Sequence, residues 1–128
     1  MTGITEIKPT DKELEILHVL WEKGPSSVKD VHGALGGEKV NGYTTILKLM
    51  QIMHEKGTVT RQKSGKLHLY SAVHSEETTR KQILDKFIAK VFKGSAAQLV
   101  ISALGNQRSS KEELDAIRKY LENLEGGD

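Results

Sequence analysis

Side chains that can read or hold nucleic acid gather between residues 39 and 72. This stretch has six lysines and arginines against one acidic residue, Glu55, although the whole chain has a formal net charge of only +2. Lys and Gln can donate hydrogen bonds to base edges in the major groove, and Lys and Arg neutralise phosphates. The residues predicted to contact bases are Thr44, Thr45, Lys48 and Gln51, and those predicted to hold phosphates are Arg61, Lys63 and Lys66. This pattern predicts binding to double-stranded DNA.

The sequence contains no motif typical of a catalytic or metal centre. The chain has no cysteine, which excludes disulfides, thiolate zinc sites, iron–sulfur clusters and cysteine nucleophiles. Its five histidines include no pair four residues apart, and the Walker, dinucleotide-binding and Gly-x-Ser-x-Gly motifs are absent. We therefore expect a protein that is not an enzyme and that uses no cofactor and no metal.

Three short helices and a hairpin are expected to position the basic residues. Apolar periodicity and end signals predict helices over residues 11–23, 28–35 and 43–56, the first opened by a capping box between Thr10 and Glu13. His18 and His32 fall on the inward faces of the first two. Segments 59–63 and 66–72 have the character of strands, and the intervening Ser64-Gly65 suits a tight turn. This order predicts a mainly α fold, a winged helix-turn-helix whose third helix enters the major groove while the hairpin contacts phosphates.

Three more helices with apolar stripes are predicted after residue 73. They cover residues 76–93, about 95–105, and a last segment opened by a capping box between Ser110 and Glu113. About 55 residues are too few to close a stable core alone, so we expect a second copy of the chain to cover the stripes. The residues expected at this dimer interface are Ile83, Leu84, Phe87, Ile88, Val91, Leu99, Leu104, Leu114, Ile117 and Leu121. The chain thus divides into a winged-helix domain, residues 1–73, and a helical dimerisation domain, residues 74–128.

The sequence lacks two features that would place the protein in or across a membrane. No apolar run approaches the roughly 18 residues of a membrane span. The first six residues, MTGITE, lack the basic and then apolar pattern of a signal peptide. We expect a cytoplasmic protein that does not insert directly into a membrane.

Further short motifs run in order from about residue 10 to residue 124. They are LEILHVLW at 14–21, YTTIL at 43–47, EKG at 55–57, Leu-Tyr-Ser at 69–71 and VFKGS at 91–95. In this order they resemble the BlaI/MecI-type penicillinase repressors, a family that includes copper-responsive relatives. The resemblance implies a winged-helix homodimer that blocks transcription from a dyad-symmetric operator and is derepressed when the dimer is lost.

The resemblance also implies how such repressors are switched off. In antibiotic-responsive members a membrane sensor with a cytoplasmic metalloprotease domain triggers cleavage in the C-terminal region. The position of the cleaved Asn-Phe bond falls on Ser102-Ala103 here, which departs from the pattern. Copper-responsive members use a Cys-x-Cys pair, which this chain lacks.

Two other functions stay open from the residues alone. The winged helix could dock an acidic protein partner through its basic surface. Alternatively, the protein could be a ligand-sensing regulator with an effector pocket between the winged helix and the C-terminal helices.

Overall fold

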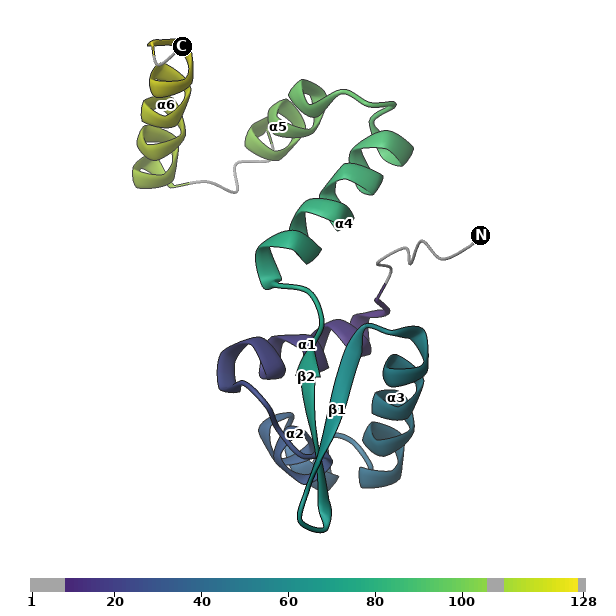
Figure 1. The fold of residues 1–128 in the computed structure, drawn as a ribbon. Helices are drawn as coiled ribbons and strands as arrows, with labels where there is room; N and C mark the ends of the chain where they lie inside the picture. The colour runs from purple at the N-terminus through teal and green to yellow at the C-terminus, as the bar shows by residue number, and fades with distance from the viewer. Residues whose placement is uncertain (1–8, 106–109, 127–128) are drawn as a thin grey trace. The chain divides into compact units, whose positions relative to one another are not determined.

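The protein folds as a winged helix-turn-helix followed by three helices (Figure 1). The computed structural model describes residues 9–105 and 110–126. Its elements are α1 (Asp11–Lys23), α2 (Val28–Ala34), the 3-10 helix η1 (Gly37–Lys39), α3 (Tyr43–Lys56), β1 (Val59–Ser64), β2 (Leu67–Ala72), α4 (Glu76–Val91), α5 (Ala96–Gly105) and α6 (Lys111–Gly126). β1 and β2 pair as an antiparallel hairpin, the wing. The predicted mainly α, winged-helix fold is confirmed.

One hydrophobic core holds α1, α2, α3 and the wing together, and we call residues from α1 to β2 the winged-helix unit. The inward side predicted for α3 consists of Tyr43, Ile46, Leu47, Met50 and Met53. Ile46, Met50 and Met53 are buried and Leu47 is partly buried, but Tyr43 is 42% exposed, so the prediction is wrong for Tyr43. The buried apolar residues are Ile16, Leu17, Val19, Leu20, Val28, Val31, Ile46, Met50, Met53, Val59 and Tyr70. The expected inward orientation of His18 is wrong, because its side chain is exposed and meets the edge of Trp21 at a ring-centroid distance of 5.3 Å.

The wing turn lies one residue later than predicted. β1 continues to Ser64 and β2 begins at Leu67, so Gly65 and Lys66 form the turn instead of Ser64 and Gly65. Gly65 has a φ of 63°, a left-handed conformation that costs glycine little. Lys66 therefore lies in the turn and not in the strand.

α4 ends two residues earlier than predicted, at Val91 instead of Lys93. Lys93 and Gly94 have φ values of 52° and 90°, and the Gly94 amide donates to the Ile88 carbonyl oxygen at 3.0 Å. This left-handed ending closes the helix because the final carbonyls find donors beyond it.

Burial separates the two parts of the chain. One compact unit ends at Leu84 and the next begins at Asp85. Thr79 in the first turns of α4 is only 2% exposed, but no described residue of α5 or α6 is buried. The large apolar side chains exposed in α4, α5 and α6 are Leu84, Phe87, Val91, Val100, Ile101, Leu114, Tyr120, Leu121 and Leu124.

Candidate nucleic-acid interface

The outward side of α3 carries the four residues predicted to contact base edges. Thr44, Lys48 and Gln51 are spaced four and three residues apart, so their side chains form one row along the helix. Thr45 lies about 100° around the axis from Thr44. All four side chains are exposed, opposite the buried side of the helix. The structure therefore aligns three of the four, with Thr45 on the flank of the row.

The N-terminus of α3 is fixed by a carboxylate of the protein itself. The Tyr43 amide donates to Glu38 Oε2 at 2.7 Å, and the same oxygen lies 3.2 Å from His32 Nε2. His32 Nε2 also lies 2.8 Å from the Asn41 carbonyl oxygen. The first amide of α3 thus already has an anionic partner, whereas the N-cap residue Gly42 offers no side-chain acceptor to the next amides. Sequence reasoning did not identify these contacts, because η1 and the linker carry no periodic pattern.

The strand register places two predicted phosphate ligands on one face of the wing. Arg61 pairs with Tyr70 and Lys63 with His68, on the face that carries the buried Val59. Arg61 and Lys63 are exposed, so this face passes from apolar core to cationic surface as it approaches the turn. The Arg61 guanidinium donates to the Tyr70 hydroxyl at 3.5 Å.

The base of the wing is tied to the segment before α2. The Ser26 amide donates to the Tyr70 carbonyl oxygen at 3.0 Å, and the Tyr70 amide donates to the Ser26 carbonyl oxygen at 2.8 Å. These reciprocal bonds give β2 a partner on its second edge, and both residues are buried. The wing is therefore anchored where it leaves the core, which holds its cations in place relative to α3.

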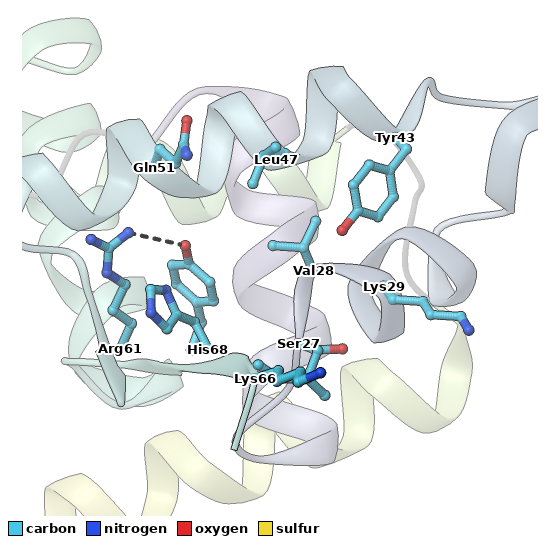
Figure 2. A pocket seen from close by; sticks show the side chains of 11 residues that line it. Ser27, Val28, Lys29, Tyr43, Leu47, Gln51, Arg61, Lys66 and His68 are labelled. Carbon is cyan, nitrogen blue, oxygen red and sulfur yellow. Dashed lines mark hydrogen bonds between the residues drawn. The ribbon is translucent and has the colours of Figure 1, made fainter. Parts of the chain in front are cut away.

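An open cavity of about 410 Å³ lies between α2, α3 and the wing, and we call it the α3–wing groove (Figure 2). It brings together Gln51, Arg61 and Lys66 of the predicted set. The other described residues that line it are Ser27, Val28, Lys29, Tyr43, Leu47, Leu67, His68 and Tyr70. No acidic residue is among them, so the groove favours an anionic occupant. Thr44, Thr45, Lys48 and Lys63 lie outside this lining.

Lys29 and His68 are groove residues that sequence reasoning missed. Both are exposed, and both line the groove beside Arg61 and Lys66. Lys29 lies in a segment of net negative charge, residues 1–38, so a sum of charges along the chain hides it. The cross-strand register could have identified His68, because it faces Lys63.

Lys56 belongs to the predicted charge excess but is engaged within the fold. Its ammonium lies 3.0 Å from Glu13 Oε2, and the side chain of Glu13 is only 4% exposed. Glu13 Oε1 also accepts the Thr10 amide at 3.0 Å, which completes the predicted capping box. The charge of Lys56 therefore links the end of α3 to the start of α1.

Acidic groups beside the groove are engaged in local structure. Asp30 accepts the Ser27 amide at 3.1 Å, and this backbone hydrogen bond holds the pKa of the exposed carboxyl below its usual range.

In the described part of the chain, no three His, Asp or Glu side chains converge in the way that metal ligands do. No single described helix is long and apolar enough to cross a membrane, and only α4 and α5 together, across a sharp bend, reach that length and composition.

Three helices, a two-stranded wing and a cationic groove between α3 and that wing define a winged-helix DNA-binding regulator. Residues 9–123 match the family model "Penicillinase repressor", and the chain belongs to this family. It is a DNA-binding transcriptional repressor of the BlaI/MecI type.

Two curated relatives illustrate the match. The methicillin resistance regulatory protein MecI of Staphylococcus aureus strain N315 is 26% identical over 109 residues, which are 85% of this chain and 89% of MecI. The transcriptional regulator BlaI of Mycobacterium tuberculosis strain H37Rv is 28% identical over 119 residues, 91% of this chain and 85% of BlaI. These relatives are regulators, a non-enzymatic class of protein.

Solved structures show the same fold. The solution structure of the DNA-binding domain of the repressor BlaI aligns with a TM-score of 0.50 at 24% identity, over 59% of this chain and 90% of that domain. The transcriptional regulator Tm0710 from Thermotoga maritima aligns with a TM-score of 0.52 at 19% identity, over 91% of this chain and 74% of Tm0710.

Proposed function

We propose that this protein is a homodimeric repressor that binds a dyad-symmetric operator through α3 and the wing. The observation that carries the proposal is the α3–wing groove, where Gln51 from α3 and Arg61 and Lys66 from the wing line one cavity without a carboxylate. A side chain that reads bases and two that neutralise phosphate thus face the same space. A protein that binds a specific duplex needs both kinds of contact, to base edges for sequence preference and to phosphates for position.

In the proposed complex α3 lies in the major groove of the operator. Lys48 and Gln51 contact base edges, and Thr44 and Thr45 contact bases or the adjacent phosphates near the N-terminus of the helix. Arg61, Lys63 and Lys66 hold the phosphates beside the wing, and Lys29 adds a cation from α2 across the α3–wing groove. Phosphate contacts fix the register, and the α3 contacts supply the sequence preference.

The dimer part of the proposal rests on uncovered apolar surface. Phe87 and Val91 of α4 are 45% and 53% exposed, and Leu121 of α6 is 51% exposed. An isolated chain would leave this surface in water, whereas a second copy would remove it. The proposed interface consists of Ile83, Leu84, Phe87, Ile88, Val91, Leu99, Leu104, Leu114, Ile117 and Leu121, within a dimerisation domain of residues 74–128.

Loss of the dimer is the proposed route to derepression. Two linked half-sites bind far more tightly than one because the second contact forms at high effective concentration. Ser102 and Ala103 are exposed residues of α5, so cleavage there by a partner such as a membrane sensor-protease would cut the dimerisation domain. Any signal that separates the two copies would act in the same way.

The proposal is tested by footprinting and gel shifts on DNA upstream of the protein's own gene. A Lys63→Ala, Lys66→Ala double variant is expected to weaken binding to all sequences and to reduce the slope of log K against log salt by about 1.8, since each phosphate contact contributes about 0.9. Gln51→Ala is expected to relax the preference at one base pair, at a cost of about 1–3 kcal/mol. Lys111→Ala, which removes an exposed cation at the start of α6, serves as the control and should leave both quantities unchanged.

Two results would contradict the proposal. An unchanged salt slope in the double variant would remove the wing from the interface. Binding that follows charge alone, with no preferred sequence, would favour an acidic protein partner over an operator.

A further inference from the structure

The chain is held firmly at the point where it leaves the winged-helix unit. The Trp21 indole nitrogen donates to the His74 carbonyl oxygen at 2.9 Å, a bond between residues 53 positions apart. One residue earlier, the Val73 amide donates to the Thr58 carbonyl oxygen at 3.0 Å. These bonds connect the segment between β2 and α4 to α1 and to the residue before β1.

The first turns of α4 are fixed by a second set of contacts. Ser75 caps the helix by accepting the Thr78 amide at 3.0 Å, and Thr79 is buried at 2% exposure. Glu76 Oε2 lies 3.7 Å from His18 Nδ1 of α1 and accepts Arg80 Nη2 at 2.9 Å. An open cavity of about 470 Å³, lined by His18, Trp21 and Glu76 among others, borders this contact.

We propose that this junction, formed by His18, Trp21, His74 and Glu76, is the positioning element that sets the half-site spacing accepted by the repressor. The inference rests on the proposed homodimer. It goes beyond the proposed DNA contacts, because none of these four residues lines the α3–wing groove. The junction determines the direction in which α4 departs, and in a dimer that direction determines where the second winged-helix unit lies.

The length of α4 makes this direction matter. α4 has 16 residues, and at 1.5 Å per residue a helix of that length is about 24 Å long. A swing of roughly 10° at one end of such a rod moves the other end by about 4 Å, which exceeds the roughly 3.4 Å rise of one base pair. A junction that holds α4 to a few degrees therefore discriminates between operators that differ by one base pair in spacing.

The test is a series of operators whose two half-sites are moved apart in single-base-pair steps across one helical turn. The full-length wild-type protein is expected to lose about tenfold in affinity when the spacing departs by two base pairs from its optimum. Trp21→Phe keeps an aromatic ring but removes the indole donor. It is expected to reduce that loss to about threefold, while binding to an isolated half-site and the dimer mass from light scattering stay unchanged.

A matched pair on α4 separates the junction from general effects of charge. Glu76→Gln removes the carboxylate that faces His18 and should flatten the spacing profile in the same direction as Trp21→Phe. Glu77→Gln makes the same chemical change at an exposed neighbour and should leave the wild-type profile intact.

The outcomes distinguish failure of this inference from failure of the proposed function. A sharp spacing optimum retained by Trp21→Phe and Glu76→Gln, in proteins that still dimerise, would show that the junction does not set the spacing. If Trp21→Phe also loses half-site affinity, the comparison of Glu76→Gln with Glu77→Gln decides. Wild-type protein that is monomeric by light scattering would contradict the proposed dimer itself, whereas a wild-type dimer without a spacing optimum would contradict the role of the junction.

Discussion

The winged-helix unit and the pair of helices α5 and α6 use the same local signals but differ in what they bury. α1 begins with a capping box between Thr10 and Glu13, and α6 begins with the same box between Ser110 and Glu113. Yet Ile16 of α1 is fully buried, whereas Leu121 of α6 is 51% exposed. Caps and apolar periodicity therefore define where helices form in both regions. Among the residues that the structure describes, however, the apolar side is buried in α1 and not in α5 or α6.

This difference raises the question of what stabilises α5 and α6. An isolated helix shorter than about 12–15 residues is marginal in water, and helices in proteins owe most of their stability to tertiary packing. α5 has ten residues, α6 has 16, and no described residue of either is buried. We propose that the winged-helix unit is stable as a monomer and that a second copy of the chain covers the exposed apolar residues of the second region.

The largest expected effect comes from a charge placed in the proposed interface. Phe87→Asp, on the exposed apolar side of α4, is expected to produce monomers and to weaken binding to a full operator by about 10²–10⁴-fold, because the second half-site contact no longer benefits from effective concentration. Light scattering and gel shifts measure the two quantities. Ala89→Asp introduces the same charge at an exposed position of the same helix that lies outside the proposed interface, and it should preserve the dimer. A dimeric Phe87→Asp protein would show that the interface lies elsewhere.

A second pair of substitutions compares the core of the winged-helix unit with the proposed dimer interface. Ile46→Ala removes a fully buried side chain from the winged-helix unit, and it should lower the free energy of unfolding by about 2–5 kcal/mol at any protein concentration. Leu121→Ala should destabilise only the dimer, so its effect on the melting temperature should disappear as the protein is diluted. Thermal melts over a hundredfold range of concentration distinguish the two. A concentration-independent effect of Leu121→Ala would mean that α6 packs within its own chain.

Substitutions of two lysines of α3 should have smaller effects, one on stability and the other on DNA binding. Lys56→Met deprives the nearly buried Glu13 carboxylate of its cation and should cost about 1–2 kcal/mol of stability, with the DNA affinity of the folded protein unchanged. Lys48 is exposed on the outward row of α3. Lys48→Met should therefore weaken DNA binding and leave the free energy of unfolding within about 0.5 kcal/mol of wild type. Urea unfolding and gel shifts measure both. Equal losses of DNA affinity in the two variants would place Lys56 in the interface.

The sequence predicted those parts of the molecule that depend on neighbours along the chain. Apolar periodicity and end signals predicted a helix over residues 43–56, and α3 has these bounds, with Gly57 at a φ of 85° directly after it. The wing was also predicted, but its turn lies at Gly65 and Lys66, because strand pairing, and not the local preference of Ser64-Gly65, fixes the register.

Contacts between distant residues could not be predicted in the same way. The approach of Lys29 to the wing and the pairing of Lys56 with Glu13 depend on tertiary packing, which no short pattern encodes. The exposure of His18 has a similar origin. Its helical position is compatible with the core, but α1 turns that position toward the start of α4, where Glu76 faces it.

The smallest expected effect concerns the cap of α2, which lies beside the groove. The Ser27 amide, and then the Ser27 hydroxyl, lower the pKa of Asp30 in the folded protein, so the folded state favours the ionised carboxyl. A group whose folded pKa is depressed stabilises the protein above its unfolded pKa, about 3.9, and loses this contribution as the pH falls through the folded pKa. Asp30→Asn should therefore lower the melting temperature slightly at pH 7, and the difference from wild type should shrink as the pH falls through the folded pKa of Asp30. Melts of both proteins from pH 7 to pH 3 measure it. A difference that stays constant with pH would mean that the shape of the Asp30 side chain, and not its charge, stabilises the cap of the winged-helix unit.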